Sequence, residues 1–206
     1  MWISVIGGPG TQKHAVVKAL VEDDGFVPME PQDTEPLHKD PMSRQIWLMV
    51  ARWRMQREIM RRAAEEDIVT VRTFWDTHHA YSGVMLRHGE ITDVQFCQLR
   101  QMSAALGETL EPPKVLLHLK ATRIDQHTRQ GLKERTQLSD ELLLDVEHAY
   151  ENFIDQIRVP VLLIDVSRPF EQILADVRSE VTALRATQAV GGQSIWQRSF
   201  FRSTAT

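Results

Sequence analysis

The chain has 206 residues, a formal net charge of −4 at pH 7 and a single cysteine, Cys97. This length suits one compact domain with a sizeable core. The negative net charge argues against a nucleic-acid-binding protein whose whole surface is basic. A lone cysteine excludes an intramolecular disulfide and fits a reducing interior, and we expect Cys97 to be a small residue of the core. No apolar run approaches the ~20 residues of a membrane span, and no leader precedes the first strand pattern, so we expect a cytoplasmic protein with no membrane contact.

Short apolar segments alternate with helical patterns in the first half of the chain. Residues 1–6 are apolar and end at a glycine-rich turn, which predicts a buried strand. A helix is expected from residue 15 onward, and a second strand over 26–29. The polar, proline-containing segment 32–41 predicts a loop. Residues 43–66 contain no glycine or proline and place apolar side chains at helical spacing, which predicts a long helix.

The second half of the chain continues this alternation. The expected elements are, in order, a strand over 68–71, helices over 75–86 and 92–106, a strand over 115–119, a charged segment over 122–135, a helix over 139–157, a strand over 159–166 and a helix over 170–185. Thr92 and Ser139 are suitable N-cap residues for two of these helices. Such alternation is typical of a parallel sheet covered on both faces. The sequence therefore predicts an α/β domain over 1–186, with a five-stranded parallel sheet flanked by helices, followed by a C-terminal tail over 187–206.

A glycine-rich loop joins the first strand to the first helix and reads Gly7-Gly8-Pro9-Gly10-Thr11-Gln12-Lys13-His14. In such a loop, backbone N–H groups surround phosphate oxygens, and the helix N-terminus adds partial positive charge. Gly7, Gly10 and Lys13 match the Walker A spacing, in which the lysine reaches the outer phosphates. Gln12 replaces the last glycine of that pattern, and His14 replaces the hydroxyl residue that normally holds magnesium. A phosphate-binding loop is one interpretation, and a plain strand-to-helix turn is the other.

Other polar motifs follow the remaining strands, where ligands of parallel sheets bind. Glu30-Pro31 follows the second strand, Arg72 ends the third, and an arginine-bearing segment over 123–135 follows the fourth. Gln45 lies early in the long helix, and Ala80-Tyr81-Ser82-Gly83 comes after the third strand. From about Met1 to Val177, this order of motifs resembles the deoxynucleoside kinase and thymidylate kinase superfamily. The resemblance implies a P-loop kinase with a helical lid, which uses ATP and Mg²⁺ and acts on a nucleoside-type substrate.

The resemblance also implies roles for individual residues. Glu30 would be the general base, since a carboxylate accepts the proton of an attacking hydroxyl, and Arg72 and Lys13 would hold the transferred phosphate. ATP would bind to Gly7, Gly8, Gly10, Thr11, Gln12, Lys13 and His14, with Arg129 and Arg135 of the lid. The acceptor would bind near Gln45, Asp76 and Tyr81, where an amide offers a donor and an acceptor to a pyrimidine edge.

Several positions depart from the family or carry a second interpretation. Val71 replaces the acidic residue that precedes the strand-end arginine in the family, so Asp76 is the nearby substitute and the magnesium ligands stay unassigned. His78-His79 has no second ligand cluster at metal spacing, so we expect no zinc site. Glu30 and Gln45 also fit solvated surface positions, and Trp47 and Trp53 fit the core better than a base-stacking role.

The sequence leaves the acceptor open among a free pyrimidine deoxynucleoside, a nucleotide and a modified base in DNA. The last of these would make the protein a 5-hydroxymethyluracil DNA kinase of phage thymidine hypermodification, which would work in the host cytoplasm. The tail favours that alternative, because its aromatic and arginine residues, Trp196, Arg198, Phe200, Phe201 and Arg202, could stack on bases and pair with phosphates. A second alternative, favoured by Gln12, His14 and Val71, is a nucleotide-binding module that has lost catalysis. A homodimer is compatible with each of these interpretations.

Overall fold

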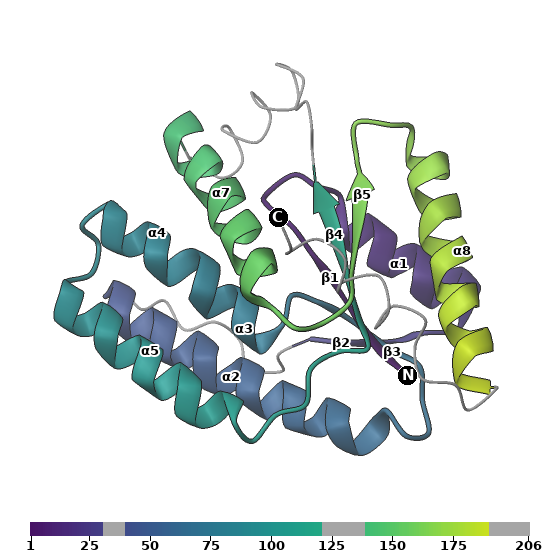
Figure 1. Cartoon of the computed structure of the whole chain (residues 1–206), viewed down its shortest axis with the longest axis horizontal. Helices are drawn as coiled ribbons and strands as arrows, with labels where there is room; N and C mark the ends of the chain where they lie inside the picture. Colours follow the sequence, from purple (N-terminus) through teal and green to yellow (C-terminus); the bar gives the residue numbers. More distant parts are fainter. Residues whose placement is uncertain (31–39, 121–138, 190–206) are drawn as a thin grey trace, which may run out of the picture.

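The fold is known from a computed structural model, which describes residues 1–30, 40–120 and 139–189. Five parallel strands form one sheet in the order β2-β3-β1-β4-β5. Their bounds are β1 (Trp2–Ile6), β2 (Val27–Met29), β3 (Ile68–Val71), β4 (Val115–Lys120) and β5 (Val161–Asp165). The predicted five-stranded parallel sheet is thus confirmed. Because all the strands are parallel, their carboxyl ends lie along one edge of the sheet, which is the upper edge in Figure 1.

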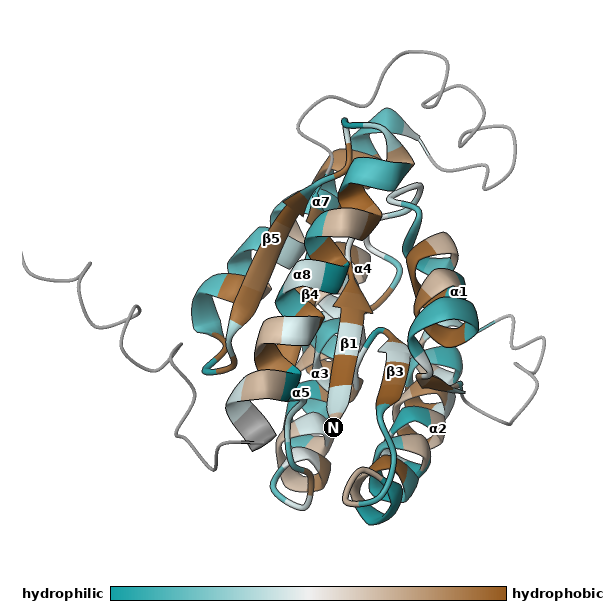
Figure 2. Ribbon diagram, turned by 90° about the vertical axis from the view of Figure 1, so that its right-hand side faces the viewer, coloured by the Kyte–Doolittle hydropathy of each residue, from teal (hydrophilic) through white to brown (hydrophobic). Residues whose placement is uncertain are grey.

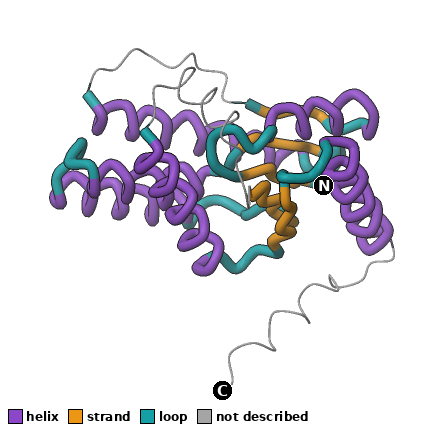
Figure 3. The backbone as a smooth tube through the Cα atoms, turned by 90° about the horizontal axis from the view of Figure 1, so that it is seen from above, coloured by secondary structure: helices purple, strands orange, loops and turns teal. Residues whose placement is uncertain are grey.

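Helices cover both faces of the sheet. They are α1 (Lys13–Asp24), α2 (Pro41–Arg62), α3 (Phe74–Asp76), the π-helix η1 (Thr77–Tyr81), α4 (Ser82–Arg87), α5 (Asp93–Gly107), α7 (Asp140–Gln156) and α8 (Phe170–Ala189). Helices α1 and α8 cover one face, and the other helices form a thicker layer on the opposite face, with α5 outermost (Figure 1). Viewed from above, the strands lie between these two unequal layers of helix (Figure 3). No helix in the described part of the chain is long and apolar enough to cross a bilayer.

The central strand β1 explains why the sheet needs two layers of helices. All five of its residues are buried, so the strand has no solvent-facing side. Ile3 and Val5 pack against α1 and α8, whereas Trp2 and Ile6 pack against the helices of the other face. In Figure 2 β5 and parts of β1 and β3 have the brown colour of hydrophobic residues.

Three local features differ from the sequence expectations. Helix α2 begins at Pro41, because the Asp40 carboxylate accepts a hydrogen bond from Ser43 N (2.7 Å) and caps the helix two residues before the expected start. Helix α8 continues to Ala189, past the expected end at residue 185, and residues 190–206 of the tail lie outside the described part. Cys97 is exposed, so its predicted place in the core is wrong. The buried residues of α5 are Leu99 and Ser103, which share a face that Cys97 does not.

The two predicted N-caps are confirmed. Thr92 accepts a hydrogen bond from Gln95 N (3.3 Å), and the Gln95 side chain returns to Thr92 N (2.9 Å), which completes a capping box on α5. Ser139 accepts a hydrogen bond from Leu142 N at 3.1 Å and caps α7. Both helices therefore start where local side chains satisfy their free N–H groups.

Gly7 is the residue at which β1 turns away from the sheet, and its backbone φ is +145°. A Cβ atom built there would lie 2.4 Å from the carbonyl oxygen of Leu119 on the neighbouring strand β4. Both the backbone conformation and the close approach of β4 therefore require glycine at this position.

We expect Gly7→Ala to lower the free energy of unfolding by more than about 1 kcal/mol, because the backbone must strain and β4 must move. Gly83→Ala is the matched control, since Gly83 lies in α4 with nothing within 4 Å of its added Cβ. The control should be neutral or stabilising by up to about 1 kcal/mol, the difference in helix propensity. Urea unfolding of both variants checks this, and equal stability of the two would contradict the required close approach.

Candidate active site

The loop between β1 and α1 contains two residues in the left-handed conformation. Gln12 has φ 58° and ψ 20°, and Gly10 also has a positive φ of 80°. Gln12 therefore adopts the left-handed conformation that glycine adopts most easily, at the position where the Walker A pattern has glycine. The substitution of glutamine adds conformational strain of about 1–2 kcal/mol but does not remove the turn.

Lys13 is buried at the start of α1 and turns its ammonium group back onto the loop. Its Nζ donates to the Gly8 carbonyl and to Thr11 Oγ1 (3.2 Å), and the Thr11 hydroxyl itself donates to the Gly8 carbonyl at 2.9 Å. Burial, together with the nearby charge of Arg72, lowers the pKa of Lys13 to about 7, although Asp76 opposes the shift. The lysine is therefore held beside the loop carbonyl, in the place where a Walker A lysine meets phosphate.

Arg72 follows the end of β3 and has a backbone φ of 71°, which is unusual for a residue other than glycine. Its guanidinium group donates to the Tyr81 hydroxyl (2.9 Å) and stacks over the Tyr81 ring at 4.8 Å. Burial alone would lower the pKa of Arg72, but Tyr150, Tyr81 and Asp76 outweigh it, so the pKa is raised. Arg72 is therefore charged, and Tyr81 of η1 fixes the direction of its side chain. Strained backbone conformations of this kind often occur at functional sites.

Asp76 is the last residue of α3 and is fully buried. One carboxylate oxygen accepts hydrogen bonds from the backbone N–H and the hydroxyl (2.8 Å) of Thr73, and the other accepts from the Tyr150 hydroxyl at 2.9 Å. Burial, together with the negative charge of Asp76, raises the pKa of Tyr150 well above its usual value, so Tyr150 remains a neutral donor. This network fixes the start of η1 against α7.

Two residues of α2 bring unpaired polar atoms to the same region. Gln45 Oε1 and Arg52 Nε and Nη1 are buried and have no hydrogen-bond partner among the described residues. Arg52 lies seven residues after Gln45, which places both on one face of the helix two turns apart. The charges of Asp76 and Arg72 both act on Arg52, and burial lowers its pKa. By contrast, the Gln56 side chain is satisfied by Glu111 O (2.8 Å) and Phe74 N (3.2 Å) and is structural.

The electrostatic balance of this region is positive. Lys13 and Arg52 are buried and Arg72 is half-buried, and the buried carboxylate that acts on all three is Asp76. A buried charge is stable only when it is paired, or when it loses its proton as Lys13 does near neutral pH. The edge of the sheet beside the glycine-rich loop therefore carries an excess of positive charge that an anion would balance.

The structure places four of the predicted site residues close to one another. Lys13, Arg72, Asp76 and Tyr81 interact with one another through the contacts and charges described above. Glu30 directly follows β2 and is exposed, and Gln12 and His14 are exposed at the start of α1. Arg129 and Arg135 of the expected lid, and the residues from Pro31 to Lys39, lie outside the described residues.

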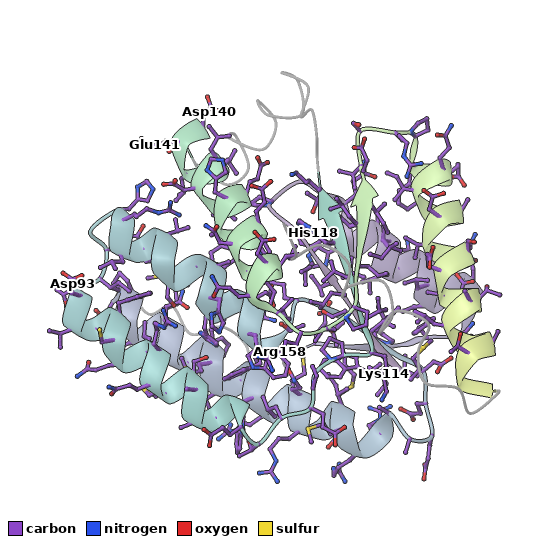
Figure 4. All side chains as sticks on the ribbon, in the orientation of Figure 1. Asp93, Lys114, His118, Asp140, Glu141 and Arg158 are labelled. Carbon is purple, nitrogen blue, oxygen red and sulfur yellow. The ribbon has the colours of Figure 1, made fainter. Side chains whose placement is uncertain are left out.

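Some functional neighbours were missed by sequence reasoning. Arg52 had a signal in its spacing from Gln45. The contact between Tyr150 of α7 and His118 of β4 had none, because these two elements meet only in three dimensions. His118 lies between β4 and α7 in Figure 4 and stacks on Tyr150 at 6.2 Å. Burial, with the charge of Lys120, lowers the pKa of His118 to about 4. Trp53 is structural, since its Nε1 donates to Thr109 Oγ1 at 2.9 Å.

The described residues do not provide the usual magnesium site of a Walker A loop. His14 has no hydroxyl, Val71 has no carboxylate, and both oxygens of the substitute Asp76 already accept hydrogen bonds from Thr73 and Tyr150. Across residues 1–30, 40–120 and 139–189 there is no group of three or more histidine, cysteine, aspartate or glutamate side chains placed to hold a metal ion. A metal bound here would therefore need ligands from elsewhere, such as the phosphates of a nucleotide.

Comparison with known proteins supports the fold. No protein-family model and no curated protein matches the sequence. Solved structures of deoxyadenosine kinase from M. mycoides are similar in three dimensions. The structure with bound dATP has a TM-score of 0.68 at 15% identity, covering 88% of this chain and 100% of the kinase. Those with bound dCTP and with the products dCMP and dCDP have TM-scores of 0.69 and 0.67 at 15% and 14% identity, each covering 89% of this chain and 100% of the kinase.

The chain therefore has the same fold as these deoxyadenosine kinase structures. The sheet, its flanking helices and the glycine-rich loop after the first strand all agree with that fold. At this level of identity the comparison establishes the fold, and the chemistry rests on the site itself.

The lowered pKa of Lys13 predicts a pH dependence of phosphate binding. In the free protein Lys13 loses its proton above about pH 7, whereas a bound phosphate favours the ammonium form, so binding takes up a proton. Between pH 7.5 and 9 the affinity for inorganic tripolyphosphate should fall by up to about tenfold per pH unit. Calorimetry over this range measures the slope, and Lys13→Arg is the control, because its charge is permanent. Equal slopes for the two proteins would show that Lys13 does not meet the phosphate.

Proposed function

We propose that the protein is an ATP-dependent kinase that phosphorylates a hydroxyl group of a pyrimidine deoxynucleoside-type acceptor. The observation that carries this proposal is the excess of positive charge around Asp76, which consists of Lys13, Arg52 and Arg72 beside the glycine-rich loop. An anion with several charges, such as a triphosphate, supplies the missing partners. A kinase also needs such charge to stabilise the phosphoryl group in transfer.

On the donor side, the N–H groups of the turn from Gly7 to Gln12 and the N-terminus of α1 cradle the ATP phosphates. Lys13 exchanges its contact with the Gly8 carbonyl for a phosphate oxygen, which restores its ammonium form. Arg129 and Arg135 complete the donor site from the lid, and Mg²⁺ reaches the site on the phosphates of ATP. This assignment is supported by the left-handed conformation of Gln12, at the position where the Walker A pattern has glycine.

On the acceptor side, Gln45 and Arg52 read the edge of the base. Both side chains are buried and carry unpaired polar atoms, which in a dry pocket cost about 1–3 kcal/mol each unless a ligand pairs with them. The amide of Gln45 offers a donor and an acceptor, and the guanidinium of Arg52 offers donors only. A pyrimidine with a carbonyl oxygen toward Arg52 and an amide-like edge toward Gln45 satisfies this set.

In the proposed transfer, the acceptor hydroxyl attacks the γ-phosphorus atom, the bond to the ADP oxygen breaks, and Glu30 takes the hydroxyl proton. Glu30 is exposed after β2 and is therefore open to a substrate at the edge of the sheet. Arg72, held by Tyr81, stabilises negative charge on the moving phosphoryl group. The chemistry needs mainly positioning and electrostatic stabilisation, which these fixed side chains supply.

The similar structures support a deoxynucleoside-type acceptor. The M. mycoides deoxyadenosine kinase structures contain dATP, dCTP, and dCMP with dCDP, so the same fold accommodates deoxynucleotides of more than one base. In this chain, the amide of Gln45 and the guanidinium of Arg52 on α2 are the features that argue for a pyrimidine.

The direct test is transfer from γ-labelled ATP to a panel of deoxynucleosides, deoxynucleotides and DNA containing 5-hydroxymethyluracil. We expect label on a free pyrimidine deoxynucleoside and none with Lys13→Met. Label on the DNA alone would instead support the hypermodification kinase, and deleting residues 193–206 should then reduce transfer. ATP binding without transfer to any acceptor would support a binding module that has lost catalysis.

Glu30 provides a second test within the transfer reaction. Glu30→Gln keeps the shape of the side chain but cannot accept the proton, so kcat should fall by about 10²- to 10⁴-fold. The KM for ATP should change little, because Glu30 is at the acceptor. Steady-state kinetics with a saturating acceptor gives both values, with Glu22→Gln on the outer surface of α1 as the control. An unchanged kcat in the Glu30 variant would remove Glu30 from the mechanism.

A further inference from the structure

One cavity in the described part of the chain lies away from the glycine-rich loop. It has a volume of about 500 Å³ and lies between η1 and α4 on one side and α5 and α7 on the other. Its lining includes none of Lys13, Glu30, Gln45, Arg52 and Arg72, so it is separate from the site described above. The three helices α4, α5 and α7 that border it appear on the left of Figure 1.

Buried polar groups without partners line this cavity. Both ring nitrogens of His78 and the hydroxyl of Ser82 have no hydrogen-bond partner among the described residues, and these side chains are only 5% and 1% exposed. Burial, with the charges of Arg52 and His79, lowers the pKa of His78 to about 3, so the ring is neutral and offers one donor and one acceptor. Leaving such groups unpaired is unfavourable, and a ligand in the cavity would pair them.

The charged residues of the cavity lining are all basic. Arg87 and Arg100 contribute to the wall, and no aspartate or glutamate does, although the whole chain has a net charge of −4. Arg87 pairs with Asp145 at the surface (3.4 Å), whereas Arg100 lies over the Phe96 ring (5.9 Å) and has no acidic partner in the described segments. Arg100 is thus available to a negatively charged ligand.

Aromatic side chains form much of the remaining wall. Trp75, His79 and Phe153 line the cavity and also a second hollow of about 250 Å³ beside it, which ends near Arg158. Arg158, which is labelled in Figure 4, is an exposed residue between α7 and β5. The rings of His79 and Phe153 are 5.9 Å apart and tilted by 30°. Walls of this kind suit a flat ring system.

We propose that this cavity is a second ligand site, which takes a small molecule with a planar aromatic ring and one anionic group. The ring packs against the wall formed by Trp75, His79 and Phe153. Its polar edge pairs with His78 and Ser82, and the anionic group meets Arg100. A nucleoside monophosphate and an aromatic carboxylate share this chemistry. The volume of about 500 Å³ is within the range of small-molecule pockets.

Occupancy of this site would act on the active site through η1, and this part of the inference rests on the proposed kinase function. His78 and His79 of η1 face the cavity, while Tyr81 at the end of the same π-helix holds Arg72. Asp76, which accepts a hydrogen bond from Tyr150, directly precedes η1. π-Helical turns are rare and are frequently found at functional sites. A ligand that shifts η1 would therefore change the position of Arg72 and the rate of transfer.

Binding is tested without turnover, in the Lys13→Ala protein, by calorimetric titration with dAMP and with 1-naphthoate. We expect at least one of the two probes to bind. Ala104→Trp, which places a large ring in the cavity from an exposed position of α5, should abolish that binding. Arg100→Glu should weaken it about tenfold or more. Lys18→Glu is the matched charge reversal, on the far helix α1, and should leave it unchanged.

Binding of dAMP alone would identify a nucleotide as the ligand, and binding of 1-naphthoate alone would identify an aromatic acid. Failure of both probes to bind would overturn the proposal, as would binding that survives both Ala104→Trp and Arg100→Glu. In the protein with Lys13 intact, the bound probe should change the rate of transfer, and Ala104→Trp should remove that effect. Because the binding measurement needs no transfer, a failure of the kinase assignment remains distinguishable from a failure of the second site.

Discussion

The site depends on an excess of positive charge, in which three cationic side chains surround one buried carboxylate. Lys13 and Arg52 are buried and Arg72 is half-buried, and Asp76 is the buried acid that acts on each of them. The protein tolerates the imbalance in two ways, since the pKa of Lys13 is about 7 and Tyr81 shares the charge of Arg72. A polyanion at the edge of the sheet would remove the imbalance, and this electrostatic argument supports the proposed kinase function.

The fold positions this cluster through a small number of fixed contacts. Gly7 lets β1 turn close to the Leu119 carbonyl of β4. The left-handed Gln12 then starts α1, so that Lys13 lies at the same edge of the sheet. Asp76 joins Thr73 to Tyr150, which fixes the path from β3 through η1 to α7. The same η1 separates the active site from the cavity beside α5, so one short irregular helix contributes to both.

Much of this arrangement could be predicted from the sequence, because it depends on local patterns. The buried strands, the capped starts of α5 and α7, and the loop with Lys13 all have short-range signals. Cys97 was misplaced because α5 is an outer helix that buries only one face, at Leu99 and Ser103. The partnership of Asp76 with Tyr150 joins residues 74 positions apart, and the unpaired nitrogens of His78 depend on packing, so neither has a sequence signal.

A crystal structure with a non-hydrolysable ATP analogue and a pyrimidine deoxynucleoside tests the central claim most directly. The account predicts that Lys13 Nζ leaves the Gly8 carbonyl and contacts an outer phosphate oxygen. It also predicts that the base lies within hydrogen-bonding distance of Gln45 and Arg52. An analogue bound away from the glycine-rich loop, with Lys13 still on the Gly8 carbonyl, would contradict it.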